Sequence, residues 1–354
     1  MTFPSDPSAA GPAPYAELTP AAVLDALDGV GLRGDGRILQ LNSYENRVFQ
    51  VFLEDGRVVV AKFYRPERWS DAQILEEHAF AGELAAAEIP VAAQLPMVRD
   101  PQSPHAAAIV EVGATLATIT IGEHAYRFGA CDRFAGRAPE LDDPEVLRWL
   151  GRYIGRMHAV GARSRFEKRL TLDVPTYGDA SRDWLLAHDS ITPDMAAIWR
   201  ELVETALAVC RAAFDQSPLK QLRLHGDCHL GNVLWTAHGP HFVDLDDAVN
   251  GPAVQDLWML LSGDRQAMMR QLLDVLEGYE SFMDFDWREL RLVEPLRTLR
   301  MLHHSAWIAK RWEDPSFPIA FPWFASPSYW AEQCARLREQ LEAMAEPPLG
   351  GGLQ

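Results

Sequence analysis

Three oxygen-bearing side chains lie close together in the C-terminal half of the sequence. Asp227 and Asn232 belong to the segment LHGDCHLGNVLW, and Asp244 follows it in HFVDLDDA. Transfer of a phosphoryl group from ATP to a hydroxyl needs a carboxylate that accepts the hydroxyl proton and oxygen ligands that hold Mg²⁺ on the phosphates. The pattern therefore predicts Asp227 as the base and Asn232 and Asp244 as the metal ligands.

These side chains can meet only if the chain between them turns back on itself. Asp244 ends the apolar run HFV, and it lies beside the Asn232 loop if residues 233–243 form a hairpin. Two glycines in the HGDCHLGN loop allow it a tight path, because glycine adopts backbone conformations that other residues avoid. We therefore expect Asp227, Asn232 and Asp244 to surround one small volume.

The neighbours of the base have less specific interpretations. His225 either orients the loop through hydrogen bonds or packs as an ordinary buried histidine, with equal weight. Asp256 is expected to bond the loop backbone in a structural role. Cys228 and His229 adjoin Asp227, but a site for a soft metal ion is not expected there because the remaining ligands are missing.

A single lysine stands in the apolar, strand-like run RVVVAKFY. Burial of an unpaired ammonium is costly, so Lys62 is expected to pair with a carboxylate on the following helix, DAQILEEHAFAGELAAAE. Glu77 is favoured because its helical phase relative to Leu84 points it toward the sheet, and Glu76 is the alternative. Such a pair aims a lysine at the α- and β-phosphates of ATP. The competing interpretation is that Lys62 only caps a strand edge.

The segment LNSYENR joins the first two predicted strands, where kinases place a loop that covers the phosphates. This loop has no glycine. Ser43 and the neighbouring backbone N–H groups can still hydrogen-bond phosphates. An ordinary polar turn is the equally weighted alternative from the residues alone.

Other motifs in the sequence do not fit their usual contexts. GVGLRG matches the dinucleotide-binding pattern, which normally follows a strand and begins a helix. Here a helix-like stretch precedes it and a strand follows, so we interpret it as a helix end and turn. VDLDDA resembles the start of aspartate-nucleophile phosphatases, yet it comes late in the chain. The four cysteines contain no C-x-x-C pair, which favours reduced thiols over a zinc or redox site.

The hydrophobic pattern changes once along the chain. Strand-like runs, RILQL, RVFQVFL and RVVVAKFY, precede the predicted helix, and IVEVGATLATITIG and HAYRFGACDRF follow it as further strands. Beyond them the apolar spacing is helical over residues 142–164, 193–215, 265–283, 287–311 and 327–345. An α+β fold with a sheet-rich first part and a helical second part is expected.

The division into parts follows from these patterns. Residues 1–16 are expected to be a disordered tail, 17–128 an N-lobe that binds the ATP phosphates, and 129–137 a hinge rich in Gly. Residues 138–345 are expected to form a helical C-lobe with the catalytic loop, and 346–354 a second disordered tail.

Composition limits the partners of the protein. The 354 residues carry a formal net charge of −17, which argues against a nucleic-acid partner and against docking on anionic membranes. The N-terminus lacks the basic and apolar regions of a secretory signal, and no apolar run approaches the length of a membrane-spanning helix. A cytoplasmic protein is expected, and a monomer, since no coiled-coil heptads occur.

The catalytic segment and several longer motifs match known kinases. H-G-D-x-x-x-x-N followed by a strand and D-x-D resembles the aminoglycoside and choline kinase group, which has a bilobal protein-kinase-like fold. LNSYENRVFQV, VVAKFYRPERWS, ILEEHAF, LHGDCHLGN and FVDLDDAVNGPAVQDLWMLLSGD are more specifically similar to the stress response kinase A family. The resemblance covers roughly residues 20–345, with the motifs in the same order.

The resemblance implies roles for individual residues. By position, Asp227 is the proton acceptor, Asn232 and Asp244 bind Mg²⁺, and Asp244 also counts as catalytic. Ser43 takes the ATP-contacting place in the N-lobe loop. Asp244 runs almost directly into a helix, so there is no room for an activation loop.

The resemblance also implies the acceptor. The family phosphorylates Ser and Thr hydroxyls of proteins, itself included, in the bacterial stress response. The alternative is a small-molecule hydroxyl kinase of the aminoglycoside, choline or homoserine kinase type, and a silent nucleotide-binding module is disfavoured because base, ligands and lysine are all present. The helix around residues 297–312, which includes Arg300, either lines the acceptor site or forms a solvated basic face, the latter being favoured.

Overall fold

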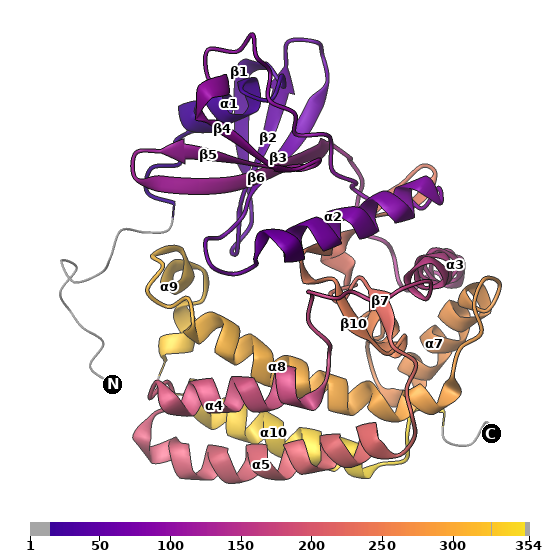
Figure 1. Cartoon of the computed structure of the whole chain (residues 1–354). Helices are drawn as coiled ribbons and strands as arrows, with labels where there is room; N and C mark the ends of the chain where they lie inside the picture. Colours follow the sequence, from indigo (N-terminus) through magenta and orange to yellow (C-terminus); the bar gives the residue numbers. More distant parts are fainter. Residues whose placement is uncertain (1–14, 327, 351–354) are drawn as a thin grey trace. The chain divides into compact units, whose positions relative to one another are not determined.

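The computed structural model describes residues 15–326 and 328–350, which form two compact units (Figure 1). The sheet unit contains residues up to 138 together with 232–246, and the helical unit contains residues 139–231 together with 247–350. An antiparallel sheet in one unit and a mainly helical second unit confirm the predicted α+β fold.

The sheet unit is built around six antiparallel strands in the order β1-β2-β3-β6-β5-β4. Its elements are α1 (Pro20–Asp28), β1 (Gly34–Leu41), β2 (Arg47–Leu53), β3 (Val58–Phe63), α2 (Asp71–Ala86), the short η1 (Ala106–Ala108), β4 (Ile109–Gly113), β5 (Leu116–Ile121) and β6 (His124–Asp132). Side chains from α1 and from one face of the sheet form the core of this unit, because alternate residues of a strand point to opposite faces.

Local sequence explains the two elements on which the site depends. The β2–β3 hairpin turns at Gly56, whose φ of 86° is the left-handed conformation that glycine adopts without strain. Helix α2 begins at a capping box in which the Ser70 hydroxyl accepts from the Gln73 N–H and the Gln73 side chain accepts from the Ser70 N–H. Both elements lie where the sequence predicted them.

A second hairpin, β8 (Val233–Thr236) and β9 (Gly239–Phe242), belongs to the sheet unit although it lies far along the chain. Backbone bridges join Val91 to Phe242 and Arg137 to Trp235. The predicted C-lobe boundary therefore differs from the observed grouping at this segment. The predicted hinge also differs, because its first residues, 129–132, are the end of β6.

The helical unit contains a two-stranded antiparallel ladder and a set of packed helices. Its elements are α3 (Pro144–Gly161), η2 (Val174–Asp179), α4 (Ala180–Ala187), α5 (Pro193–Asp215), β7 (Leu222–Leu224), η3 (Leu230–Asn232, ending in the sheet unit), η4 (Leu245–Asp247, which begins there), β10 (Val249–Gly251), α6 (Val254–Trp258), α7 (Arg265–Tyr279), η5 (Trp287–Leu292), α8 (Val293–Ala309), α9 (Ser316–Ala320), η6 (Pro322–Ala325) and α10 (Tyr329–Ala345).

Helix α8 runs through the core of this unit, with α4, α5 and α10 against it (Figure 1). The core is rich in aromatic side chains, and Trp199 and Trp330 pack edge to face at its centre. The predicted helix 193–215 is α5 as expected, whereas the predicted helix 287–311 divides into η5 and α8. Helix α4 was missed, because its apolar pattern is short.

The inner ends of both predicted disordered tails, at residues 15–16 and 346–350, make defined contacts. Residues 1–14 and 351–354 lie outside the described part of the chain, but Tyr15 is buried, and its hydroxyl donates to the Glu45 carbonyl at 3.1 Å. At the other end Leu349 is buried against the helical unit, and Arg265 donates to the carbonyl oxygens of Pro347 and Pro348. These local contacts outweigh the Pro- and Gly-rich composition that predicted disorder.

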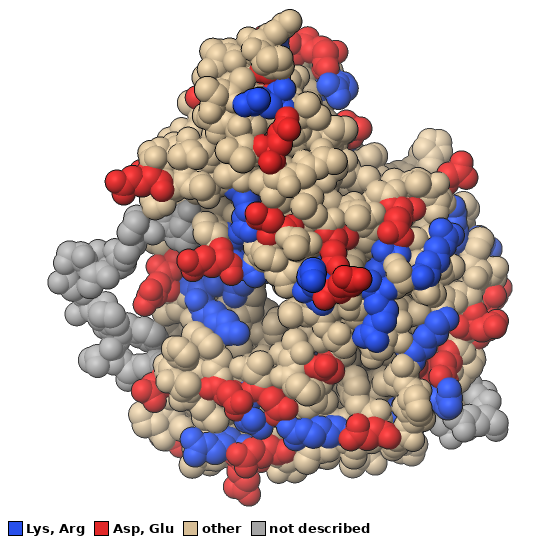
Figure 2. Space-filling model, in the orientation of Figure 1, with Lys and Arg blue, Asp and Glu red and all other residues tan. Residues whose placement is uncertain are grey.

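Three further observations concern both units. Within residues 15–326 and 328–350, the structure contains no helix with the length and apolar character needed to cross a bilayer. The four cysteines are free and buried. Figure 2 shows basic and acidic side chains interspersed over the face in view.

Candidate active site

Asn232 and Asp244 flank the open end of the β8–β9 hairpin. The register pairs Val233 with Phe242, and the Val243 N–H donates to the Asn232 carbonyl oxygen at 3.0 Å. The hairpin expected between the two residues is therefore present, and it brings both metal-ligand candidates to one place in the sheet unit.

Asp244 has an unusual backbone conformation for its position. Its φ is 59°, in the left-handed region that aspartate adopts more readily than most residues. Strain of this kind persists only where the surrounding structure enforces it, and it often marks a functional residue. The side chain is 53% exposed, so its carboxylate is available to a ligand.

Lys62 on β3 pairs directly with this carboxylate. Its Nζ lies 2.9 Å from Asp244 Oδ1 and 3.8 Å from Asp246 Oδ1, and the side chain is 14% exposed. Burial disfavours the ammonium and alone would lower the pKa of Lys62, but the charges of Asp244 and Asp246 outweigh burial and hold the pKa well above its usual value. Lys62 is therefore a cation in a low-dielectric position, suited to bind phosphate oxygens.

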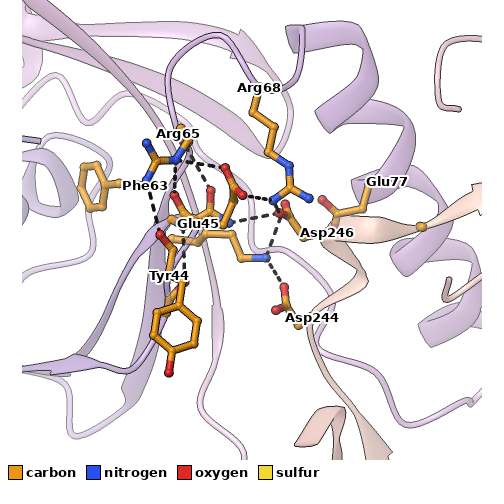
Figure 3. A network of polar contacts seen from close by, with 12 residues as sticks. Tyr44, Glu45, Phe63, Arg65, Arg68, Glu77, Asp244 and Asp246 are labelled. Atoms are coloured by element: carbon orange, nitrogen blue, oxygen red, sulfur yellow. Dashed lines mark hydrogen bonds and ion pairs between the residues drawn. The ribbon is translucent and has the colours of Figure 1, made fainter. Parts of the chain in front are cut away.

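The predicted pairing of Lys62 with Glu77 needs correction. The ion pairs of Lys62 run to Asp244 and Asp246, whereas the buried Glu77 contributes a weaker charge to the pKa of the lysine. Figure 3 shows the Glu77 side chain extending from α2 toward this cluster. Helical phase correctly placed Glu77 on the sheet side of α2, but it could not reveal that two aspartates from residues 244–246 lie closer.

Ser43 lies in the loop between β1 and β2, as predicted. Its Oγ accepts a hydrogen bond from the Asn46 N–H at 3.3 Å, which closes a local turn. Arg65, just beyond β3, holds the same loop by donating to the carbonyl oxygens of Tyr44 and Glu45 (Figure 3). The loop is thus held by polar contacts and does not depend on glycine.

Asp227 belongs to the helical unit, on the loop that follows β7. The backbone N–H groups of His225 and Gly226 donate to the Asp256 carboxylate at 2.8 and 2.9 Å, so Asp256 anchors the loop as predicted. His158 on α3 donates from Nε2 to the same carboxylate at 3.0 Å. Gly226 has a φ of 83°, and a Cβ there would lie 2.2 Å from the Asp247 carbonyl oxygen, so only glycine fits.

The carboxylate of Asp227 is held by two side chains. Arg300 on α8 donates from Nη1 to Asp227 Oδ1 at 2.5 Å, and His229 Nε2 lies 3.3 Å from Oδ2. Burial alone would raise the pKa of Asp227, but the hydrogen bond from His229 and the charge of Arg300 dominate and hold it well below its usual range. The Asp227 side chain is therefore ionised and able to accept a proton.

Sequence reasoning did not identify Arg300 as a partner of Asp227. The two residues are 73 positions apart, and the helix that carries Arg300 was interpreted as a solvated face. His225, for which two interpretations were open, is fully buried, and its Nδ1 accepts from the Asp227 N–H at 3.4 Å. It therefore contributes to the loop geometry.

The donor set fits a hard divalent cation. Asn232 and Asp244 offer amide and carboxylate oxygens, and Mg²⁺ is usually held by few protein ligands together with phosphates and water. Among the described residues no group of three or more His, Cys, Asp or Glu side chains is arranged to hold a metal ion. Cys228 is fully buried, and burial raises the pKa of its thiol, as expected for a structural cysteine.

The sequence-predicted residues thus fall into two groups. Lys62, Asn232 and Asp244 lie together in the sheet unit, and Asp227 lies in the helical unit. The meeting of Asp227 with the metal ligands stays a prediction, supported by the five positions that separate Asp227 from Asn232 in the chain.

Known proteins are similar in sequence to this chain over most of its length. Residues 37–293 match the phosphotransferase enzyme family. Stress response kinase A of Escherichia coli strain K12 is 42% identical over 335 residues, which cover 95% of this chain and 96% of the relative. A serine/threonine protein kinase, RdoA, of Salmonella typhimurium strain LT2 is 40% identical over the same share of both chains.

A solved structure shares the fold at low sequence identity. The amicoumacin kinase hAmiN, determined with AMP-PNP, Ca²⁺ and Ami, superposes with a TM-score of 0.69 at 17% identity, over 93% of this chain and 94% of that one. This likeness shows the fold, and the sequence matches show the family. The chain belongs to the phosphotransferase enzyme family and, within it, to the group of stress response kinase A.

Proposed function

We propose that the protein is an ATP- and Mg²⁺-dependent serine/threonine protein kinase that phosphorylates proteins, itself included, in a bacterial stress response. The observation that carries the proposal is the Lys62–Asp244 ion pair at the end of the hairpin that also presents Asn232. A buried lysine beside two oxygen ligands is the arrangement that binding of a metal–nucleotide needs. The name of the Salmonella relative supports a protein acceptor.

Each predicted site residue of the sheet unit has a role in binding the nucleotide. When bound, Mg²⁺ neutralises charge on the phosphate oxygens of ATP. The amide oxygen of Asn232 and the carboxylate of Asp244 would hold it. The Lys62 ammonium binds phosphate oxygens, and Glu77 adds a charge that keeps it protonated. The Ser43 hydroxyl donates to a phosphate oxygen from the loop between β1 and β2.

Asp227 acts on the acceptor hydroxyl. Its carboxylate orients the hydroxyl and takes the proton as the hydroxyl oxygen forms a bond to the γ-phosphorus and the bond from that phosphorus to the bridging oxygen of ADP breaks. A carboxylate with a lowered pKa is a weak base, so this proton moves late, which suits the loose transition state of phosphoryl transfer.

A small-molecule acceptor is the second candidate. The amicoumacin kinase that shares the fold binds a small molecule, Ami, together with AMP-PNP and Ca²⁺. A small-molecule kinase and a protein kinase would use the same base, lysine and metal ligands. They differ in the surface that receives the acceptor, so the acceptor itself must be tested.

Incubation of the purified chain with γ-labelled ATP and Mg²⁺, alone and with casein, tests the proposal. Label on the chain and on casein is expected. Asp227→Ala should lower the rate by roughly 10²–10⁴-fold, because a positioned base contributes that much. Asp244→Ala should abolish the Mg²⁺-dependent rate. Asp142→Ala, which removes an exposed aspartate, is the matched control and should leave the rate unchanged.

Two outcomes would contradict the proposal. Label that reaches only an added amino alcohol or sugar would select the small-molecule kinase. Near-normal rates in Asp227→Ala or Asp244→Ala would show that the site lies elsewhere.

A further inference from the structure

Asp246 lies two positions after Asp244 and is buried, with a side chain that is 5% exposed. Its Oδ2 accepts from Arg68 Nη1 at 3.0 Å and from Asn46 Nδ2 at 3.2 Å, and its Oδ1 lies 3.8 Å from Lys62 Nζ. A carboxylate with these contacts is directed toward the protein, whereas Asp244 is exposed. The two aspartates of the D-x-D motif therefore have different surroundings.

Arg68 connects two segments that are far apart in the chain. Besides Asp246, its Nη1 lies 3.1 Å from Glu45 Oε2, and its guanidinium lies over the Trp69 ring with 5.0 Å between Cζ and the ring centroid. The side chain is only 12% exposed. Figure 3 shows Arg68 between Glu45, from the loop after β1, and Asp246, from the segment after β9.

Asn46 makes a second link between the same segments. Its Nδ2 donates to Asp246, and its Oδ1 accepts from the Arg65 N–H at 3.1 Å. Asn46, in the loop between β1 and β2, is thus hydrogen-bonded both to Arg65 and to Asp246. A glycine-rich loop would be free to move over the phosphates, whereas this loop, with no glycine, is fixed by buried ion pairs.

The charges in this cluster indicate what Asp246 does. Lys62 is buried and needs a nearby negative charge, because an uncompensated buried cation is strongly destabilising. Its nearer partner, Asp244, is also the carboxylate proposed to bind the metal. When Asp244 is occupied in that way, Asp246 remains beside Lys62, held in place by Arg68 and Asn46.

We propose that Asp246 and Arg68 form a positioning pair that keeps Lys62 and the loop of residues 42–46 arranged to receive the nucleotide phosphates. This inference rests on the proposed function. Neither residue touches the reacting atoms. Asp246 acts through Lys62 and Asn46, and Arg68 acts through Asp246 and Glu45.

The test removes the Arg68 guanidinium or the Asp246 charge. It measures the restraint of the loop and the affinity of the nucleotide site separately. Chymotrypsin cleavage after Tyr44, a residue of the loop that is 50% exposed, reports on the restraint of the loop without any need for activity. Affinity for ADP in EDTA and in Mg²⁺ reports on Lys62. Arg68→Met and Asp246→Asn should both speed cleavage at Tyr44 and weaken ADP binding in both conditions by about 10- to 100-fold, the usual effect of losing such a supporting contact.

Two further variants make the test specific. Arg68→Lys keeps the charge but loses the planar guanidinium, whose Nη1 contacts both Glu45 and Asp246, so it should restore part of the affinity. Arg57→Met removes an arginine from the β2–β3 turn, where its partner is Asp55 at 2.8 Å, and it should behave as the unmodified chain. If Arg68→Met does not fold, the comparison of Arg68→Lys with the unmodified chain decides the question.

The outcomes separate this inference from the proposed function. Unchanged cleavage at Tyr44 and unchanged ADP affinity in Arg68→Met, in a chain that transfers phosphate, would overturn the positioning pair alone. A chain that transfers no phosphate would overturn the proposed function, and faster cleavage at Tyr44 in Arg68→Met would then still support the link between Arg68 and the loop.

Discussion

Asp227 and Asp244 are both carboxylates at the candidate site, but their surroundings give them different properties. Asp244 is exposed, adopts a left-handed backbone conformation and faces Lys62. Asp227 is held by Arg300 and His229, which lower its pKa. One carboxylate is therefore suited to exchange its partner for a metal ion, and the other is suited to stay ionised and oriented.

Removing the guanidinium from Arg300 should change the pH dependence of phosphotransfer. In Arg300→Met, the pKa of Asp227 should rise toward its ordinary value, because a close positive charge that favours the ionised form is lost. The pH at which kcat/KM falls to half on the acid side should then be higher than in the unmodified chain. Rate measurements between about pH 3 and 8 test this, since a carboxyl titrates near pH 4 when unperturbed and the acid limb must be followed below that pH.

The control for this variant comes from the same helix. Arg297 on α8 pairs with Glu294 at 3.4 Å and lies over the Trp258 ring, and neither of these partners belongs to the loop that carries Asp227. Arg297→Met should leave the acid limb unchanged. An acid limb that is the same in Arg300→Met and the unmodified chain would show that Arg300 does not set the ionisation of Asp227.

At the scale of elements, the packing of α3 against α7 supports the loop that carries Asp227. His158 on α3 accepts a hydrogen bond from the Tyr279 hydroxyl of α7 at 2.9 Å and donates to Asp256, which anchors the loop. The helices approach closely because glycines lie at the crossing. A Cβ at Gly151 would lie 1.9 Å from the Val275 carbonyl oxygen.

Gly151→Ala should therefore destabilise the helical unit. The added methyl group forces the two helices apart, and overpacking of this kind costs about 1–3 kcal/mol. Chemical denaturation followed by circular dichroism measures the loss. Gly82→Ala on α2 is the matched control, since no described atom lies within 4 Å of the added Cβ, and alanine there should stabilise the helix by up to about 1 kcal/mol.

Equal midpoints of denaturation for the two glycine variants would contradict this account of the helix crossing.

The connection after Asp244 is a second feature of the elements. Only η4 and the short β10 separate Asp244 from α6, which begins at Val254. The expectation that the chain leaves no room for an activation loop is thus confirmed.

At the scale of the whole molecule, one buried carboxyl links folding to pH. Glu289 in η5 is 2% exposed, and its carboxylate accepts from the Val254 N–H at the start of α6 at 2.9 Å. Burial raises the pKa of Glu289 to about 7, against the opposing effect of that hydrogen bond. The folded chain therefore binds a proton at this position more tightly than the unfolded chain does.

This shift predicts how the free energy of unfolding depends on pH. The contribution of Glu289 is fully present below about pH 4.5, the usual pKa of the group, and is lost as the pH rises through about 7. Glu289→Gln lacks this dependence and keeps an oxygen that accepts from Val254. Relative to the unmodified chain it should gain on the order of 2 kcal/mol between pH 5 and 8.

Urea unfolding at several pH values measures this difference. Glu342→Gln, which changes an exposed glutamate on α10, is the control and should follow the unmodified chain. A constant difference between Glu289→Gln and the unmodified chain across this pH range would show that Glu289 keeps an ordinary pKa.

Short stretches of sequence were sufficient to predict the features that depend on neighbouring residues. Alternating apolar residues with a glycine turn predicted the β2–β3 hairpin, the capping box marks the start of α2, and the spacing of α5 was read correctly. The positions of Asn232 and Asp244 also followed, because the hairpin that joins them is local. Such contacts form between residues close in the chain, so short sequence patterns are enough to predict them.

The pairing of charged groups, by contrast, depends on contacts between distant segments of the folded chain. Lys62 is 182 positions from Asp244, Arg68 is 178 from Asp246, and Arg300 is 73 from Asp227. A helical phase or a strand pattern gives the direction of a side chain but not the distant segment that it faces. The partner of a buried charge is selected by the packing of whole elements, and that information is absent from any single stretch of sequence.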